Sequence, residues 1–281
     1  MKEQLERLKA VIYQIIVENV ILLHAIDFIK LRDRVFPPIM FSCIGGSEYD
    51  PHTKNIIISV KDIVKYFELA KSYNLDIETV FRINPLYKDY SVCRKECPEI
   101  LLEMPMTEDE SNLVKGLLSD SQFLQNDDVA LNDAIAIYAL AYTLYHEIGH
   151  IMLNNYIPIS ETIIREDSAD KFAFESVRSM RGYEEEEILL LGVFIGIIHV
   201  LEILNPQDES NDKEHPHSIE RLYTLFDFWG IEDDSQFWEF GYNAVIKWCV
   251  KHNQPKKWDK GSSISFKDRF ISAYYFFKKT Q

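Results

Sequence analysis

Apolar residues recur at helical spacing over about the first 35 residues of the chain. The repeating positions predict an amphipathic helix: Leu5, Leu8, Ile12, Ile15, Ile16, Val20 and Leu23. Pro37 and Pro38 end this pattern, because proline cannot continue a helix. The β-branched run Asn55–Val60 then predicts a short strand, and Lys61–Tyr73 is expected to be a helix.

The second half of the chain shows helical periodicity almost throughout. Six helices are expected, at Asp127 or Asp128 to about Leu153, Ser160 to about Met180, about Glu184–Leu204, and near Ser218–Trp229, Asp234–His252 and Ser265–Lys279. The sequence therefore predicts an α+β fold that is predominantly helical, with a short N-terminal sheet. We expect residues 1–125 to form an N-terminal region and residues 126–281 a helical core, packed together as one compact unit.

One expected helix is much more apolar than the others. Ile188–Ile198 contains no polar side chain, but this stretch is shorter than the ~20 residues that span a bilayer. A buried core helix is therefore expected here, and no membrane span. The first ten residues are highly charged and have no small-residue cleavage site after an apolar run, so they do not resemble a signal peptide.

Composition narrows the class of protein further. Hydrophobic residues make up 47% of the 281 positions, which is enough for a sizeable core. The formal net charge of −15 disfavours nucleic-acid binding, and the short basic stretch Lys251–Lys260 is expected to be a solvated helix end. The four cysteines do not make a disulfide framework, and Cys93 and Cys97 have no second pair to complete a metal site. A reducing compartment, the cytoplasm, fits this usage best.

The main candidate for chemistry is His146-Glu147-Ile148-Gly149-His150, an HExxH motif inside a predicted helix. Residues four apart lie on the same helix face, so both imidazoles can bind one zinc ion. Glu147 follows the first ligand and is placed to take a proton from a zinc-activated water. The motif therefore predicts a zinc-dependent hydrolase with Glu147 as general base.

A third ligand is expected from the next helix. Glu166 is the first candidate, and Asp170, one turn further on, can accept the N–H of a ligand histidine and fix its tautomer. Glu161 is the main competitor, whereas Asp167 points about 100° away from Glu166 on the helix. The alternative is an ordinary acidic helix face.

A third segment contains His215, His217 and Arg221. Ser218 is expected to cap the following helix, and Arg221 in its first turn opposes the helix dipole, which suggests an acidic partner such as Glu166 or Asp170. Either histidine could donate a hydrogen bond to the oxyanion formed at the attacked carbonyl. The alternative is a capped surface helix with two solvated histidines. His199, within the apolar helix, is expected to be a satisfied core histidine.

These motifs resemble those of the gluzincin metallopeptidases, whose HExxH is followed by E-x-x-A-D. The segment from Glu166 to Ala173 is similar to the E-x-E-A-N-x-F-A segment of ImmA/IrrE-type peptidases, although Glu175-Ser176-Val177 replaces their apolar ending. His215-Pro216 with Arg221 resembles the HP-x4-R signature of HtpX-type membrane peptidases, which carry transmembrane helices. The compact combination looks most like the Lit-type phage-exclusion peptidases.

The resemblance implies a zincin-like core with His146, His150 and Glu166 as zinc ligands and Glu147 as the base. It also implies a protein substrate, since Lit-type members cleave a host translation factor. We expect an intracellular endopeptidase, with a role in phage exclusion or stress response, whose substrate backbone pairs with an edge strand such as Asn55–Val60. Two alternatives stay open: a catalytically idle zincin-fold binding or sensor module of a defence or toxin system, and a small-molecule zinc hydrolase.

Overall fold

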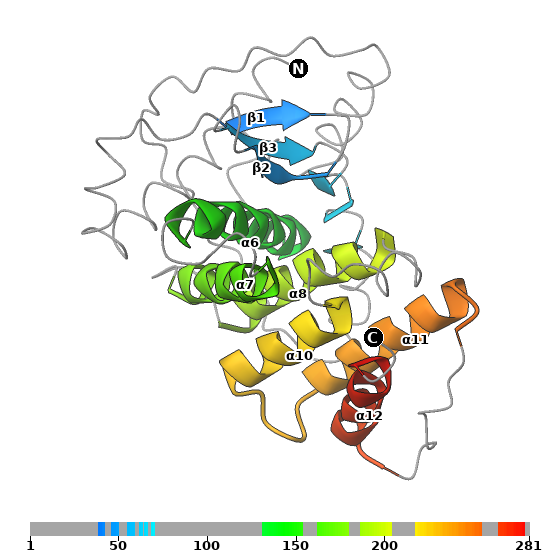
Figure 1. Ribbon diagram of the computed structural model, residues 1–281. Coiled ribbons are helices and arrows are strands. Elements are labelled where there is room, and N and C mark those ends of the chain that lie inside the picture. Colours follow the sequence, from blue (N-terminus) through cyan, green and yellow to red (C-terminus); the bar gives the residue numbers. More distant parts are fainter. Residues whose placement is uncertain are drawn as a thin grey trace.

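A computed structural model describes residues 39–42, 46–50, 55–59, 131–153, 162–179, 186–203, 217–254 and 264–278, together with six helical positions between residues 62 and 70. Its three strands and six long helices are shown in Figure 1. The helix expected in the first 35 residues lies outside the described residues, as do Cys93 and Cys97. The described part is mostly helical, as the periodicity predicts.

The strands form one small sheet in the order β1-β3-β2. β1 (Ile39–Ser42) pairs parallel to β3 (Asn55–Ser59), and β2 (Glu48–Asp50) pairs antiparallel to β3 on its other side. The strand predicted at Asn55–Val60 is therefore present, but its prediction as an edge strand is wrong. Its unbroken apolar run, in which Ile56 and Ile58 are fully buried, is typical of a central strand that has neighbours on both sides.

The six helices expected in the second half are all present, with ends that differ from the expected ones by a few residues. They are α6 (Leu131–Leu153), α7 (Thr162–Arg178), α8 (Glu186–Ile203), α10 (Ser218–Trp229), α11 (Phe237–Lys251) and α12 (Phe266–Lys278). Figure 1 shows the sheet above α6, with α7 and α8 below α6 and α10–α12 at the far end. The edge strand that lies against α6 is β2.

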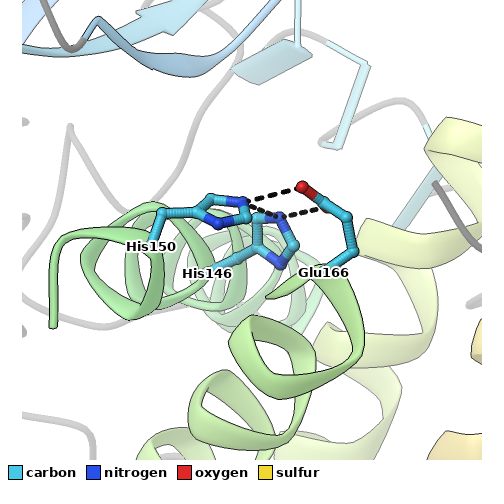
Figure 2. Close-up of side chains that lie close together, drawn as sticks. All are labelled: His146, His150 and Glu166. Carbon is cyan, nitrogen blue, oxygen red and sulfur yellow. Dashed lines mark hydrogen bonds and ion pairs between the residues drawn. The ribbon is translucent and has the colours of Figure 1, made fainter. Parts of the chain in front are cut away.

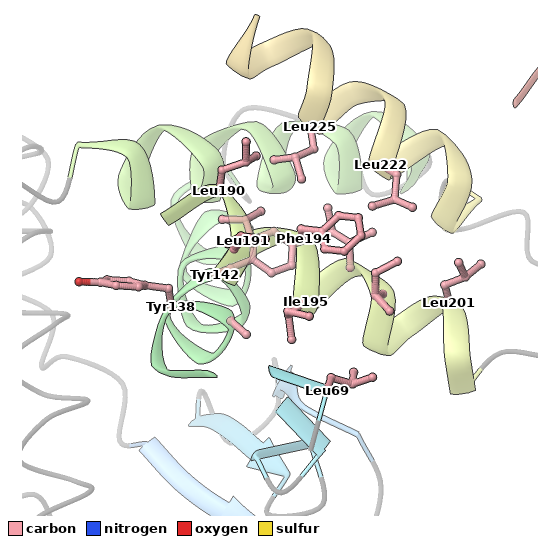
Figure 3. Packing of buried hydrophobic residues seen from close by; sticks show 14 of the residues in the cluster. Leu69, Tyr138, Tyr142, Leu190, Leu191, Phe194, Ile195, Leu201, Leu222 and Leu225 are labelled. Atoms are coloured by element: carbon pink, nitrogen blue, oxygen red, sulfur yellow. The ribbon is translucent and has the colours of Figure 1, made fainter. Parts of the chain in front are cut away.

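α8 lies at the centre of the core, as its apolar sequence predicts. Its side chains are buried from Ile188 to His199 and again at Leu201, and they pack between α6 and α10 (Figure 3). Gly192 and Gly196 face Tyr138 and Tyr142 of α6, so the two helix backbones approach closely. Within the described ranges, no helix is both long enough and apolar enough to cross a membrane.

Candidate metal centre

The HExxH motif lies near the C-terminal end of α6, where α7 packs closely against it. A Cβ atom on Gly149 would lie 3.0 Å from Cα of Ala169 and 3.3 Å from its Cβ. Two small residues at this contact allow the helices to approach, and this approach brings Glu166 on α7 to the two histidines of α6.

Figure 2 shows His146, His150 and Glu166 pointing to one common point. The Nε2 atoms of the two histidines are 3.0 Å apart. The Glu166 carboxylate oxygens lie 3.2 Å from Nε2 of His146 and 3.1 Å from Nε2 of His150. Neighbouring ligand atoms around a tetrahedral zinc are about 3.3 Å apart when the bonds are about 2.0–2.1 Å. Two imidazole nitrogens and one carboxylate thus fit three ligands of such an ion, with the fourth position left for water or substrate.

The ring of His146 is held in the orientation that a metal ligand needs. Its Nδ1 lies 2.8 Å from Oδ1 of Asp170. With Nδ1–H donating to this carboxylate, Nε2 is the ring nitrogen left to bind a metal. Burial lowers the pKa of His146, but the hydrogen bonds to Asp170 and Glu166 outweigh it and raise the pKa to about 9. Without a metal, this raised pKa favours the protonated imidazole at neutral pH.

Asp170 is itself held by Arg221 and Tyr142. Nε of Arg221 donates to Oδ2 at 2.7 Å and Nη2 to Oδ1 at 2.5 Å, and the Tyr142 hydroxyl donates to Oδ1 at 2.8 Å. Burial raises the pKa of Asp170, but the Arg221 charge and the His146 hydrogen bond outweigh it and hold this pKa well below its usual range. The carboxylate therefore stays ionised and can orient His146.

Sequence reasoning missed Tyr142. It lies one turn before His146, so both point from α6 toward α7. This spacing was a usable signal, but a tyrosine inside an apolar helix is more often part of the core. In this structure Tyr142 belongs to the site through its hydroxyl and to the core through its ring, which stacks on Phe174 with the ring centroids 5.8 Å apart.

The structure places the other predicted residues as follows. Glu147 follows His146 on α6 and is 7% exposed. His215 and Glu161 lie outside the described residues. The expected pairing of Arg221 with an acidic residue is made with Asp170 on α7.

His217 caps α10. Its Nδ1 accepts a hydrogen bond from the Ile219 backbone N–H at 3.1 Å, and its ring lies against Phe277 and Trp248. The prediction of Ser218 as the cap is wrong, because Ser218 is already the first helical residue. Histidine was overlooked because serine is the commoner cap. This position gives His217 a structural task, and its predicted catalytic role stays a prediction.

His199 is buried in α8, as expected, with Nε2 2.8 Å from Oδ1 of Asp62. Its Nδ1, however, has no hydrogen-bond partner among the described residues, so the expectation of a fully satisfied histidine is only half met.

A family model matches part of the chain. The model of the family described as Peptidase U49 matches residues 102–241, a stretch that includes the HExxH motif, Glu166, Asp170 and Arg221. Neither a curated protein nor a solved structure matches the chain. The similarity supports a peptidase, and therefore a protein or peptide as its substrate.

Proposed function

We propose that this protein is a zinc-dependent endopeptidase of the gluzincin type. The observation that carries the proposal is the convergence of three side chains: the two histidine Nε2 atoms are 3.0 Å apart, and the Glu166 carboxylate faces both, with one oxygen 3.2 Å from His146 Nε2 and the other 3.1 Å from His150 Nε2. The match of residues 102–241 to a peptidase family supports it. A buried carboxylate behind the first histidine gives further support, because ligand histidines in zinc sites are commonly oriented in this way.

The proposed roles follow from the chemistry of peptide hydrolysis. Zinc, when bound, supplies a Lewis acid that polarises the scissile carbonyl and lowers the pKa of water. Glu147 accepts a proton from the attacking water and passes it to the leaving amine. Asp170 accepts a hydrogen bond from the Nδ1–H of His146 and so orients its ring, and Arg221 keeps Asp170 ionised.

The substrate backbone is proposed to pair with β2. β3 is covered on both sides by β1 and β2, whereas β2, an outer strand of the sheet as far as the structure describes it, lies next to α6 (Figure 1). An extended peptide on this edge would form main-chain hydrogen bonds beside the helix that carries the HExxH motif. This assignment replaces the expectation that Asn55–Val60 itself binds substrate.

The biological setting is proposed from resemblance. The Lit-type pattern suggests cleavage of an intracellular, cytoplasmic protein during phage exclusion or a stress response. The alternative is a catalytically idle zincin-fold module that binds or senses a partner in a defence or toxin system. The two differ in whether the biological effect survives Glu147→Gln, which removes the base and leaves the metal ligands in place.

Metal analysis tests the site. Wild-type protein purified without chelator is expected to hold about one zinc per chain, and Glu166→Ala to hold far less. Asp167→Ala is the matched control, because Asp167 is the next residue on α7 and pairs with Lys171 at 2.6 Å. Glu161→Ala tests the competing ligand. Wild-type protein without zinc, even after reconstitution, would overturn the proposal.

Cleavage is tested separately. Zinc-loaded wild type and Glu147→Gln are each incubated with a bacterial lysate, and new protein N-termini are identified by mass spectrometry. We expect new termini in the wild-type sample alone. Zinc binding without any such termini would favour the idle binding module.

A further inference from the structure

A second, partly buried polar network connects the sheet with α8 and α6. Asp62 is at its centre: its Oδ1 is 2.8 Å from Nε2 of His199 on α8, and its Oδ2 accepts from the backbone N–H and the hydroxyl of Ser47 at 3.0 and 2.7 Å. The Ser47 hydroxyl oxygen accepts from the backbone N–H of Ser59, at the end of β3. The network therefore connects the end of β3 to the core helix α8.

Tyr66 extends this network to α6, the helix that carries the HExxH motif. Its ring meets that of His199 edge to face at 5.1 Å, and its hydroxyl lies 2.7 Å from Oγ1 of Thr143 on α6. The Thr143 hydroxyl has one proton, which it donates to the carbonyl of Ala139 at 3.1 Å. With that proton engaged, Tyr66 donates to Thr143.

The bond is made on the face of α6 that carries the proposed base. Thr143 is four residues before Glu147, so the two side chains are neighbours one turn apart. Tyr142 and His146, by contrast, point toward Asp170 on α7. Burial and the nearby carboxylates of Asp62 and Glu147 raise the pKa of Tyr66. The phenol therefore keeps the proton that it donates.

The serines of this network do not form a second catalytic site. The Ser47 hydroxyl donates to Asp62 and so is not activated by a histidine. The Ser59 hydroxyl is fully buried and has no hydrogen-bond partner among the described residues. What the network does provide is a continuous connection, made of hydrogen bonds and one ring contact, from the sheet to the Glu147 face of α6.

We propose that Tyr66 is a positioning residue, which acts through Thr143 to hold the Glu147 turn of α6 in register with the sheet and its β2 edge. The inference rests on the proposed metallopeptidase function. It assigns a task to residues upstream of the HExxH motif, a region for which the sequence suggested only a substrate-aligning strand.

A small hydroxamate tests the position of Glu147 without a known substrate. Acetohydroxamate binds an open metal position through its two oxygens and gives its hydroxyl proton to a neighbouring carboxylate. The full chain is loaded with Co²⁺ in place of zinc, and acetohydroxamate affinity is read from the visible spectrum. Glu147→Gln sets the affinity that remains when this carboxylate is absent.

The variants separate positioning from stability. Tyr66→Phe keeps the ring and removes one hydrogen bond, so acetohydroxamate affinity should fall ~3- to 10-fold while Co²⁺ binding changes less than about twofold. Thr143→Val should give the same loss, and the double variant no more than either single one. Thr143→Ser should retain wild-type affinity. Tyr223→Phe, a tyrosine of α10 that stacks on Tyr274, is the matched control.

The outcomes are distinguishable. A chain that does not bind Co²⁺ sinks the proposed function, and this inference with it. If Co²⁺ binds but Tyr66→Phe matches the wild type in acetohydroxamate affinity, the positioning role alone is overturned. The same holds if wild type binds acetohydroxamate no more tightly than Glu147→Gln. A lower unfolding midpoint of Tyr66→Phe with unchanged affinity would mean that Tyr66 only stabilises the fold.

Discussion

Arg221 on α10 reaches Asp170 on α7 with two parallel hydrogen bonds, of 2.7 and 2.5 Å, while the same carboxylate holds His146 on α6. Two consecutive helices, α6 and α7, and the more distant α10 are thus joined at one buried carboxylate. The pair is a planar guanidinium against a planar carboxylate, a geometry that lysine cannot reproduce.

Removing Arg221 should therefore weaken both the fold and the metal centre. Arg221→Met leaves Asp170 as a buried charge without its main partner, which is expected to cost about 3–5 kcal/mol of unfolding free energy. Arg221→Lys should recover only part of this loss. Urea denaturation of the metal-free chains measures it, with Arg178→Met as control, because Arg178 is exposed and pairs with Glu186 at the surface. Equal midpoints for Arg221→Met and wild type would contradict the structural role.

Asp170→Asn tests the orientation of His146. The neutral amide holds the His146 ring less strongly than the carboxylate does, so zinc affinity is expected to fall about 10- to 100-fold. Competition with a fluorescent chelator gives the affinity, and circular dichroism checks that the variant is folded. Asp167→Asn is the control. Asp167 lies one turn before Asp170 on α7 and pairs with Lys171, so this variant should keep wild-type zinc affinity.

The raised pKa of His146 predicts a pH dependence of the metal-free protein. The pKa of His146 rises from 6.5 to about 9 on folding, so its protonation stabilises the fold fully below about pH 6.5. This contribution is lost as the pH rises through 9. The urea midpoint measured in chelator should fall between pH 7 and 10, and zinc should suppress the fall. Glu166→Ala, which removes one of the carboxylates that raise this pKa, should show a smaller alkaline loss.

The close contact of α6 with α7 predicts a cost for a methyl group at position 149. In Gly149→Ala the new Cβ would lie 3.0 Å from Cα of Ala169, an atom that cannot move without the helix. A loss of about 1–3 kcal/mol is expected, together with weaker zinc binding because Glu166 shifts with α7. Gly46→Ala is the control, since a Cβ there meets nothing within 4 Å. Unchanged stability of Gly149→Ala would show that the contact is loose.

Two variants of His217 separate capping from catalysis. Asparagine is a good N-cap, so His217→Asn should stay close to wild-type stability, whereas His217→Ala should lose about 1 kcal/mol. If His217 only caps α10, cleavage activity is unchanged in the asparagine variant. Loss of cleavage in a stable His217→Asn protein would restore the predicted role as an oxyanion donor.

The sequence was most informative where the signal is local. The periodicity of apolar positions located all six helices of the second half, and the four-residue spacing of His146 and His150 placed them on one face. The neighbours of β3 could not be read in this way, because strand order depends on pairing between distant segments. The approach of Glu166 to the two histidines likewise depends on how α7 packs against α6. Tyr142 was hidden because its hydroxyl finds Asp170 only in three dimensions.

The approach of α8 to α6 links the core to the candidate metal centre. A Cβ at Gly196 would lie 2.6 Å from Cδ1 of Tyr142, the residue whose hydroxyl holds Asp170. A larger residue at 196 would push this ring, and through Asp170 it would disturb His146, although position 196 contacts no ligand. Among related chains, positions 142 and 196 should therefore vary together: tyrosine with glycine, and a larger residue at 196 only where position 142 is smaller.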